Sequence, residues 1–104
     1  MSSPLPVTLV GGAFLGRMQA SWPFARLAIG QDKLVLAAMM SEHVFTLDDN
    51  IELIWDKHPL FGFYQGVRIL HEQPDVPERL VFLYLRTQKL KKLLEATDFS
   101  LTLD

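Results

Sequence analysis

Three histidines, His43, His58 and His71, are the side chains of this sequence best suited to bind a metal or transfer a proton near neutral pH. A metal site needs ligands that converge, as they do at i and i+4 on a helix or at i and i+2 on a strand. No two of these histidines have such a spacing, and the chain contains no cysteine. The neighbouring pairs Glu42-His43 and His71-Glu72 would point to opposite faces of a strand. We therefore expect no metal site, and we expect His71 to end a strand and bond to the turn after it.

The other polar residues offer no catalytic arrangement. Asp48 and Asp49 are adjacent carboxylates, which in a cleft can divide the roles of acid and base, but the segment Asp-Asp-Asn at 48–50 has the composition of a turn between strands. No serine lies in a Gly-x-Ser-x-Gly segment, and no glycine cluster precedes a helical pattern as a phosphate-binding loop requires. We expect no enzymatic activity, no catalytic residue and no cofactor.

Composition predicts one globular domain over residues 1–104. The chain is 49% hydrophobic and 21% charged, and its formal net charge of −2 gives no general attraction to nucleic acid or to an anionic membrane. The apolar stretch 5–15 is not preceded by the Lys or Arg that a secretory signal requires. Since cysteine is also absent, we expect a cytoplasmic protein with no nucleic-acid partner.

Short apolar runs separated by turn residues predict a mostly β chain. Residues 1–12 are expected to be irregular, and Pro23 is expected to end the first strand. Leu90, Leu93 and Leu94 have helical spacing, which predicts one amphipathic helix at about 87–97 with Thr87 as its N-cap. The predicted strands are 14–20, 24–29, 33–39, 43–47, 51–58, 66–72 and 79–85. The pattern favours an α+β fold in which a bent antiparallel sheet is closed by a C-terminal helix.

The segment GVRILHEQPDVPERLVFLYL at 66–85, followed by a helix that ends in Asp-Phe, resembles the C-terminal half of PH-like domains of the GRAM and bacterial pleckstrin-homology type. The resemblance covers most of the chain, because the earlier runs have compatible spacing. It implies an antiparallel β-barrel of about seven strands capped by one C-terminal helix. The family-like pattern often has Gly where Asp98 stands, and Asp tolerates a left-handed helix cap better than most residues.

The resemblance weakens the lipid-headgroup function that is often attached to this fold. Members that bind phosphoinositides carry clustered Lys and Arg around the first hairpin, whereas Arg17, Arg26 and Lys33 are widely spaced here. Lys89 and its basic neighbours on the predicted helix have the spacing of a solvated face. The resemblance therefore implies a fold more firmly than it implies a ligand.

The loop at residues 59–66 combines turn-forming Pro and Gly with four large apolar side chains, Leu60, Phe61, Phe63 and Tyr64. Three interpretations remain open. The loop can fold back and fill the end of the barrel. It can be exposed and dock to another chain or to another copy. It can also insert into a membrane interface, although that usually needs more basic residues than this loop has nearby.

From these patterns we interpret the chain as a non-enzymatic binding or assembly module. Its expected partner is a protein or a second copy of itself, contacted by Leu60, Phe61, Phe63 and Tyr64, with Arg68 at the rim. In the alternative, a peripheral membrane or lipid-binding module uses the same loop with Lys57 and Arg68.

Overall fold

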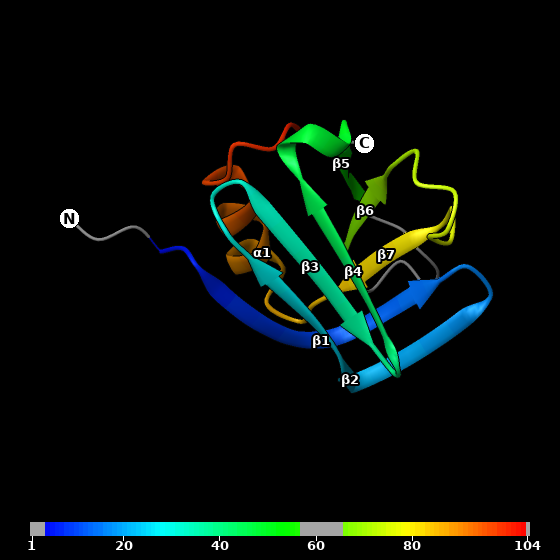
Figure 1. Cartoon of the computed structure of the whole chain (residues 1–104). Coiled ribbons are helices and arrows are strands. Elements are labelled where there is room, and N and C mark those ends of the chain that lie inside the picture. Colours follow the sequence, from blue (N-terminus) through cyan, green and yellow to red (C-terminus); the bar gives the residue numbers. More distant parts are fainter. Residues whose placement is uncertain (1–3, 57–65, 104) are drawn as a thin grey trace.

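A single curled sheet forms most of the molecule. The computed structural model describes residues 4–56 and 66–103, and within them the sheet has eight strands in the order β4-β3-β2-β1-β7-β6-β5-β8 (Figure 1). The strands are β1 (Val7–Leu15), β2 (Met18–Ile29), β3 (Lys33–Ala38), β4 (Ser41–Thr46), β5 (Glu52–Asp56), β6 (Gly66–Leu70), β7 (Leu80–Leu83) and β8 (Leu101–Leu103). The sheet curls into an open half-barrel, and the helix α1 (Thr87–Glu95) follows β7. The prediction of a mostly β, α+β chain with one helix is confirmed.

Strand β1 joins the two halves of the sheet. It pairs antiparallel with β2 on one side and with β7 on the other, and its register with β2 shifts between Gly11 and Ala13. A Cβ atom on Gly11 would collide with the backbone oxygen of Leu83, so only glycine allows β7 to approach this closely. The register shift in β1 therefore lies at two successive glycines, Gly11 and Gly12.

One hydrophobic core fills the inside of the half-barrel. Trp55, Phe45 and Phe82 are the largest of its fully buried side chains, and they come from three different strands. The helix adds Leu90, Leu93 and Leu94 to the same core, as their spacing predicts. Figure 1 shows α1 beside the turn that joins β2 to β3.

Several predicted strands have the expected places. The hairpin predicted at 24–29 and 33–39 is confirmed, because Ala25–Ile29 pairs with 34–38 of β3. The first predicted strand, 14–20, is wrong. It spans the end of β1, a turn at Gly16 with φ of 63°, and the start of β2. Residues 7–12 are not irregular but belong to β1, because the apolar positions of this stretch pack on the core.

The C-terminal region differs from the prediction in three ways. An eighth strand, β8, pairs parallel with β5, so the sheet is not wholly antiparallel. Arg86, not Thr87, occupies the N-cap position, and its side chain makes no capping bond. The helix ends at Glu95 without a left-handed residue at Asp98, because the Thr97 hydroxyl donates to the carbonyl oxygen of Leu94 at 2.7 Å and thereby satisfies the helix end.

Candidate functional site

An unusual bulge interrupts the pairing of β1 with β2. Gly11 pairs with Ala25 and Ala13 pairs with Ala20, so the four residues 21–24 of β2 lie opposite Gly12 alone. A Cβ atom on Gly12 would lie 3.0 Å from the carbonyl oxygen of Ala20, which shows that β2 passes close to β1 at the bulge. A bulge changes the direction in which the side chains of its strand point. Here two aromatic side chains of the bulge point into solvent.

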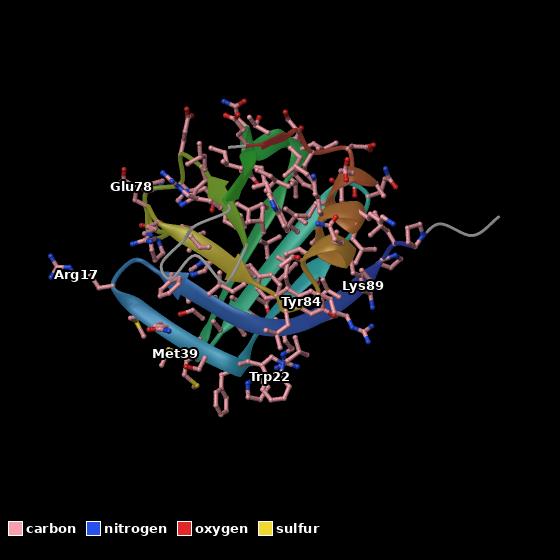
Figure 2. The ribbon with its side chains drawn as sticks, turned by 180° about the vertical axis from the view of Figure 1, so that it is seen from behind. Arg17, Trp22, Met39, Glu78, Tyr84 and Lys89 are labelled. Atoms are coloured by element: carbon pink, nitrogen blue, oxygen red, sulfur yellow. The ribbon has the colours of Figure 1, made fainter. Side chains whose placement is uncertain are left out.

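The exposed rings belong to Trp22 and Phe24, whose side chains are 65% and 70% exposed. The turn between β3 and β4 adds Met39, 59% exposed, and Met40, which is fully exposed. Since Ala25 pairs with Ala38, the turn begins beside Phe24. Figure 2 shows Trp22 and Met39 pointing outward on the same side of the molecule, away from Lys89 of α1. We call Trp22, Phe24, Met39, Met40 and the nearby Val10 the apolar patch.

A groove of about 890 Å³ runs through this patch. Its walls are mostly uncharged, and Arg26 is the one charged residue in its lining. The lining residues are Val10, Gln19, Ala20, Ser21, Pro23, Phe24, Arg26 and Met39. An open apolar groove with a single cation fits the surface of another macromolecule better than it fits catalysis, which needs converging polar groups.

The patch continues onto the outer face of β1–β4. Register places Val10, Arg26, Ala37 and Glu42 in one row across the four strands. The next row contains Thr8, Ala28, Val35 and Val44. Ala28, Val35 and Ala37 are half-buried although they face away from the core, because their side chains are short and lie against the sheet. The outer side chains of β3 at 35 and 37 are therefore short, and the exposed charges of this face are Arg26 on β2, Lys33 on β3 and Glu42 on β4.

The predicted contact residues are only partly placed. Lys57, Leu60, Phe61, Phe63 and Tyr64 lie outside the described residues. Arg68 lies on β6, where it is exposed and pairs with Ile54 and Val81. Strands β1 and β7 separate β6 from β2 in the sheet, so Arg68 does not join the apolar patch.

The structural roles predicted for His71 and Asp49 are confirmed. His71 Nε2 lies 2.7 Å from the carbonyl oxygen of Pro77, and the N–H of Gln73 donates to Nδ1 at 3.1 Å. The histidine thus holds the turn that follows β6. Asp49 ends a short 3-10 helix, and its carboxylate accepts the N–H of Thr46 at 2.7 Å. Among the described residues no three acidic, histidine or cysteine side chains gather as a metal site would require.

Sequence reasoning missed the apolar patch. Trp22 and Phe24 flank Pro23, and a proline between two apolar runs is typical of a strand end. The strand instead continues through a bulge. A usable signal was the presence of two aromatic side chains in a segment that also lacks the alternation of a half-buried strand.

No family model, no curated protein and no solved structure matches this chain. No helix in the described parts of the chain has the length and apolar character needed to cross a membrane. The residues of the apolar patch and of the face beside it are therefore the candidate functional site.

Proposed function

We propose that this chain is a non-enzymatic binding or assembly module that contacts another protein through the apolar patch. The observation that carries the proposal is the exposure of Trp22 and Phe24, 65% and 70%, on a bulge that places Phe24 beside Met39 at the start of the β3–β4 turn. Exposed apolar clusters mark interaction sites, and aromatic residues and Met are enriched in interface cores. Methionine also adapts its shape to a partner.

Burial of these two rings would supply a substantial part of the free energy that association requires. A fully buried aromatic side chain removes roughly 150–250 Å² from water, at about 25 cal/mol per Å². Two rings that are about two-thirds exposed before binding therefore supply roughly 5–8 kcal/mol. Association costs about 4–15 kcal/mol, so the patch supplies a substantial part and its surroundings must supply the rest.

Charge near the patch favours a protein partner over a membrane. Insertion into an anionic membrane surface usually needs basic residues around the apolar group. Arg26 is balanced by Glu42 in the same row of the sheet. The peripheral membrane module therefore remains an outcome of the experiment below and not the preferred function.

The proposal includes a PH-like arrangement and a cytoplasmic location. The first four strands form one antiparallel meander, β5–β7 form another, and the pairing of β1 with β7 joins them. The helix that follows β7 packs on the core between these strands. Both features support the PH-like assignment, while β8 is an addition to it. The lack of cysteine is consistent with the cytoplasm.

Loop 59–66 belongs to the proposal as a further contact region. Its apolar side chains Leu60, Phe61, Phe63 and Tyr64 are of the types that interface cores favour. Arg68, exposed on the adjoining strand β6, is the residue proposed for its rim.

Site-specific photo-crosslinking tests the proposed function. A photoreactive phenylalanine analogue replaces Phe24 in cells that produce the full chain, and the products are separated by mass on a denaturing gel. The matched control places the same analogue at Leu47, an exposed apolar residue at the opposite end of β4 from Met40. We expect a discrete protein adduct from position 24 that the control lacks. The absence of any protein adduct at position 24, or equal adducts at both positions, would overturn the proposal.

A further inference from the structure

We propose that the partner is a second copy of this chain, and that two copies pack the outer faces of β1–β4 together around a two-fold axis that runs along β3. The inference rests on the proposed function and adds the occupant and its geometry. It follows from the positions of two opposite charges on either side of β3, on an outer face whose side chains between them are short and apolar.

Arg26 and Glu42 lie on either side of β3 in the same row. Arg26 pairs with Ala37 from β2, and Glu42 pairs with Ala37 from β4. Neighbouring strands are about 4.8 Å apart, so the positive and negative positions are displaced by about equal distances from Ala37. Both side chains are exposed.

A two-fold axis along β3 exchanges these two positions. Rotation by a half-turn carries β2 of one copy over the partner's β4 while Ala37 stays at the axis. Arg26 then faces the partner's Glu42, and the same contact occurs a second time, as an isologous interface requires. At these two positions the face is complementary to itself, which points to a second copy as the occupant. The third exposed charge, Lys33, lies two rows from Ala37 at the start of β3, where it comes near its own copy only at the edge of the contact.

The side chains between the charges allow two sheets to approach closely. Face-to-face sheets pack at a separation of about 10 Å, which leaves room only for short or interdigitating side chains. Ala37 and Val35 lie on the axis, and both are half-buried within their own sheet. In the next row the axis places Ala28 opposite the partner's Val44, whose side chain is 40% exposed.

The apolar patch extends the same interface at one end of the strands. Phe24 lies on the β2 side of the axis and the Met39–Met40 turn joins β3 to β4. The rotation therefore carries Phe24 toward the partner's Met40, and sulfur–aromatic contacts of this kind are favourable. An interface of standard size buries roughly 800 Å² of each partner. That is about an eighth of the 6551 Å² surface of this chain.

Charge reversal provides the test, because it predicts a rescue that depends on pairing. The variants R26E and E42R each place like charges opposite each other twice in a homodimer. We expect each to raise the dissociation constant at least about tenfold, measured by sedimentation equilibrium. An equal mixture of the two variants restores both opposite-charge contacts. We therefore expect heterodimers in native mass spectrometry with a dissociation constant near that of the wild type.

Two controls separate pairing from general charge effects. The R26E/E42R double variant exchanges the charges within one chain and is expected to recover homodimers. K89E and E95K reverse charges on α1, away from the outer face, and are expected to leave the dissociation constant within about twofold. Thermal unfolding measurements check that each variant is folded, which we expect because all four positions are exposed.

The results distinguish this inference from the proposed function. The proposed dimer would be overturned by a wild type that remains monomeric at every concentration. It would also be overturned if the mixture of R26E and E42R did not restore a dissociation constant near that of the wild type. If position 24 then crosslinks to a protein of different mass, the binding module still stands with another partner. If the monomer instead floats with anionic phospholipid vesicles and the variant F24S does not, both proposals are overturned in favour of a membrane contact.

Discussion

Gln31 and Asp98 bond to each other twice, which ties the β2–β3 turn to the chain just beyond the helix. The side-chain Nε2 of Gln31 donates to Asp98 Oδ1 at 2.9 Å, and the N–H of Asp98 donates to the backbone oxygen of Gln31 at 2.8 Å. Nε2 also donates to the carbonyl oxygen of Ala96 at 2.9 Å. The end of α1 is therefore attached to the same meander that carries the proposed interface.

Replacing Gln31 with Ala removes both side-chain bonds and leaves the backbone bond in place. Because the site is exposed, we expect the free energy of unfolding to fall by only about 1 kcal/mol. Urea unfolding measures the change. Gln88→Ala, at an exposed position on the helix, is the matched control and should have a smaller effect. Equal losses in both variants would show that the turn-to-helix bonds contribute nothing.

Thr97→Val tests how the helix ends. The Thr97 hydroxyl donates to the carbonyl oxygen of Leu94 at 2.7 Å and accepts the N–H of Phe99 at 3.2 Å, at a position that is 9% exposed. Valine keeps the shape but leaves the N–H of Phe99 without this acceptor, while the carbonyl oxygen of Leu94 still accepts the backbone N–H of Thr97 at 3.1 Å. We therefore expect a loss of about 1–3 kcal/mol. Thr87→Val serves as control, since Thr87 is not the N-cap. A larger loss at Thr87 would restore the capping role that the sequence predicted.

The two hydrogen bonds of His71 determine its tautomer. Nδ1 accepts the N–H of Gln73, so the neutral ring must carry its proton on Nε2, which then donates to the carbonyl oxygen of Pro77. We expect ¹⁵N chemical shifts of the neutral ring to identify the Nε2–H form. We also expect His71→Ala to destabilise the fold by about 2–3 kcal/mol. The substitution removes both hydrogen bonds and a ring whose centroid lies 5.6 Å from that of the Phe45 ring. A ring protonated on Nδ1 would contradict this arrangement.

The proposed contact at loop 59–66 has its own test. Phe61→Ser/Phe63→Ser is expected to weaken self-association while leaving the midpoint of thermal unfolding unchanged at concentrations where the wild type is a monomer, because an interface residue stabilises the complex and not the monomer. Light scattering on a size-exclusion column measures the mass. A variant that unfolds would place these rings in the core, and a variant that associates like the wild type would remove the loop from the interface.

Sequence patterns located the elements better than they located the surface. Leu90, Leu93 and Leu94 predicted the helix because burial follows a period of 3.6 residues. The parallel strand β8 was missed because three residues are too few for any pattern to emerge.

The apolar patch was missed for a different reason. Trp22 and Phe24 become exposed only through the register shift opposite Gly12, which depends on pairing between strands and not on local composition. The match between Arg26 and Glu42 likewise depends on two register relations that meet at Ala37. Long-range pairing decides both features, and no local pattern in the chain contains it.

Sedimentation equilibrium of the wild type and of Phe24→Ser tests the central claim most directly. The chain has a mass of 11.9 kDa. We expect the wild type to approach twice this mass as its concentration rises. Phe24→Ser should stay near the monomer mass, and its unfolding midpoint should equal that of the wild type at concentrations where both are monomers, because the ring is 70% exposed in the single chain. A wild type that sediments as a monomer throughout, with Phe24→Ser indistinguishable from it, would contradict the account.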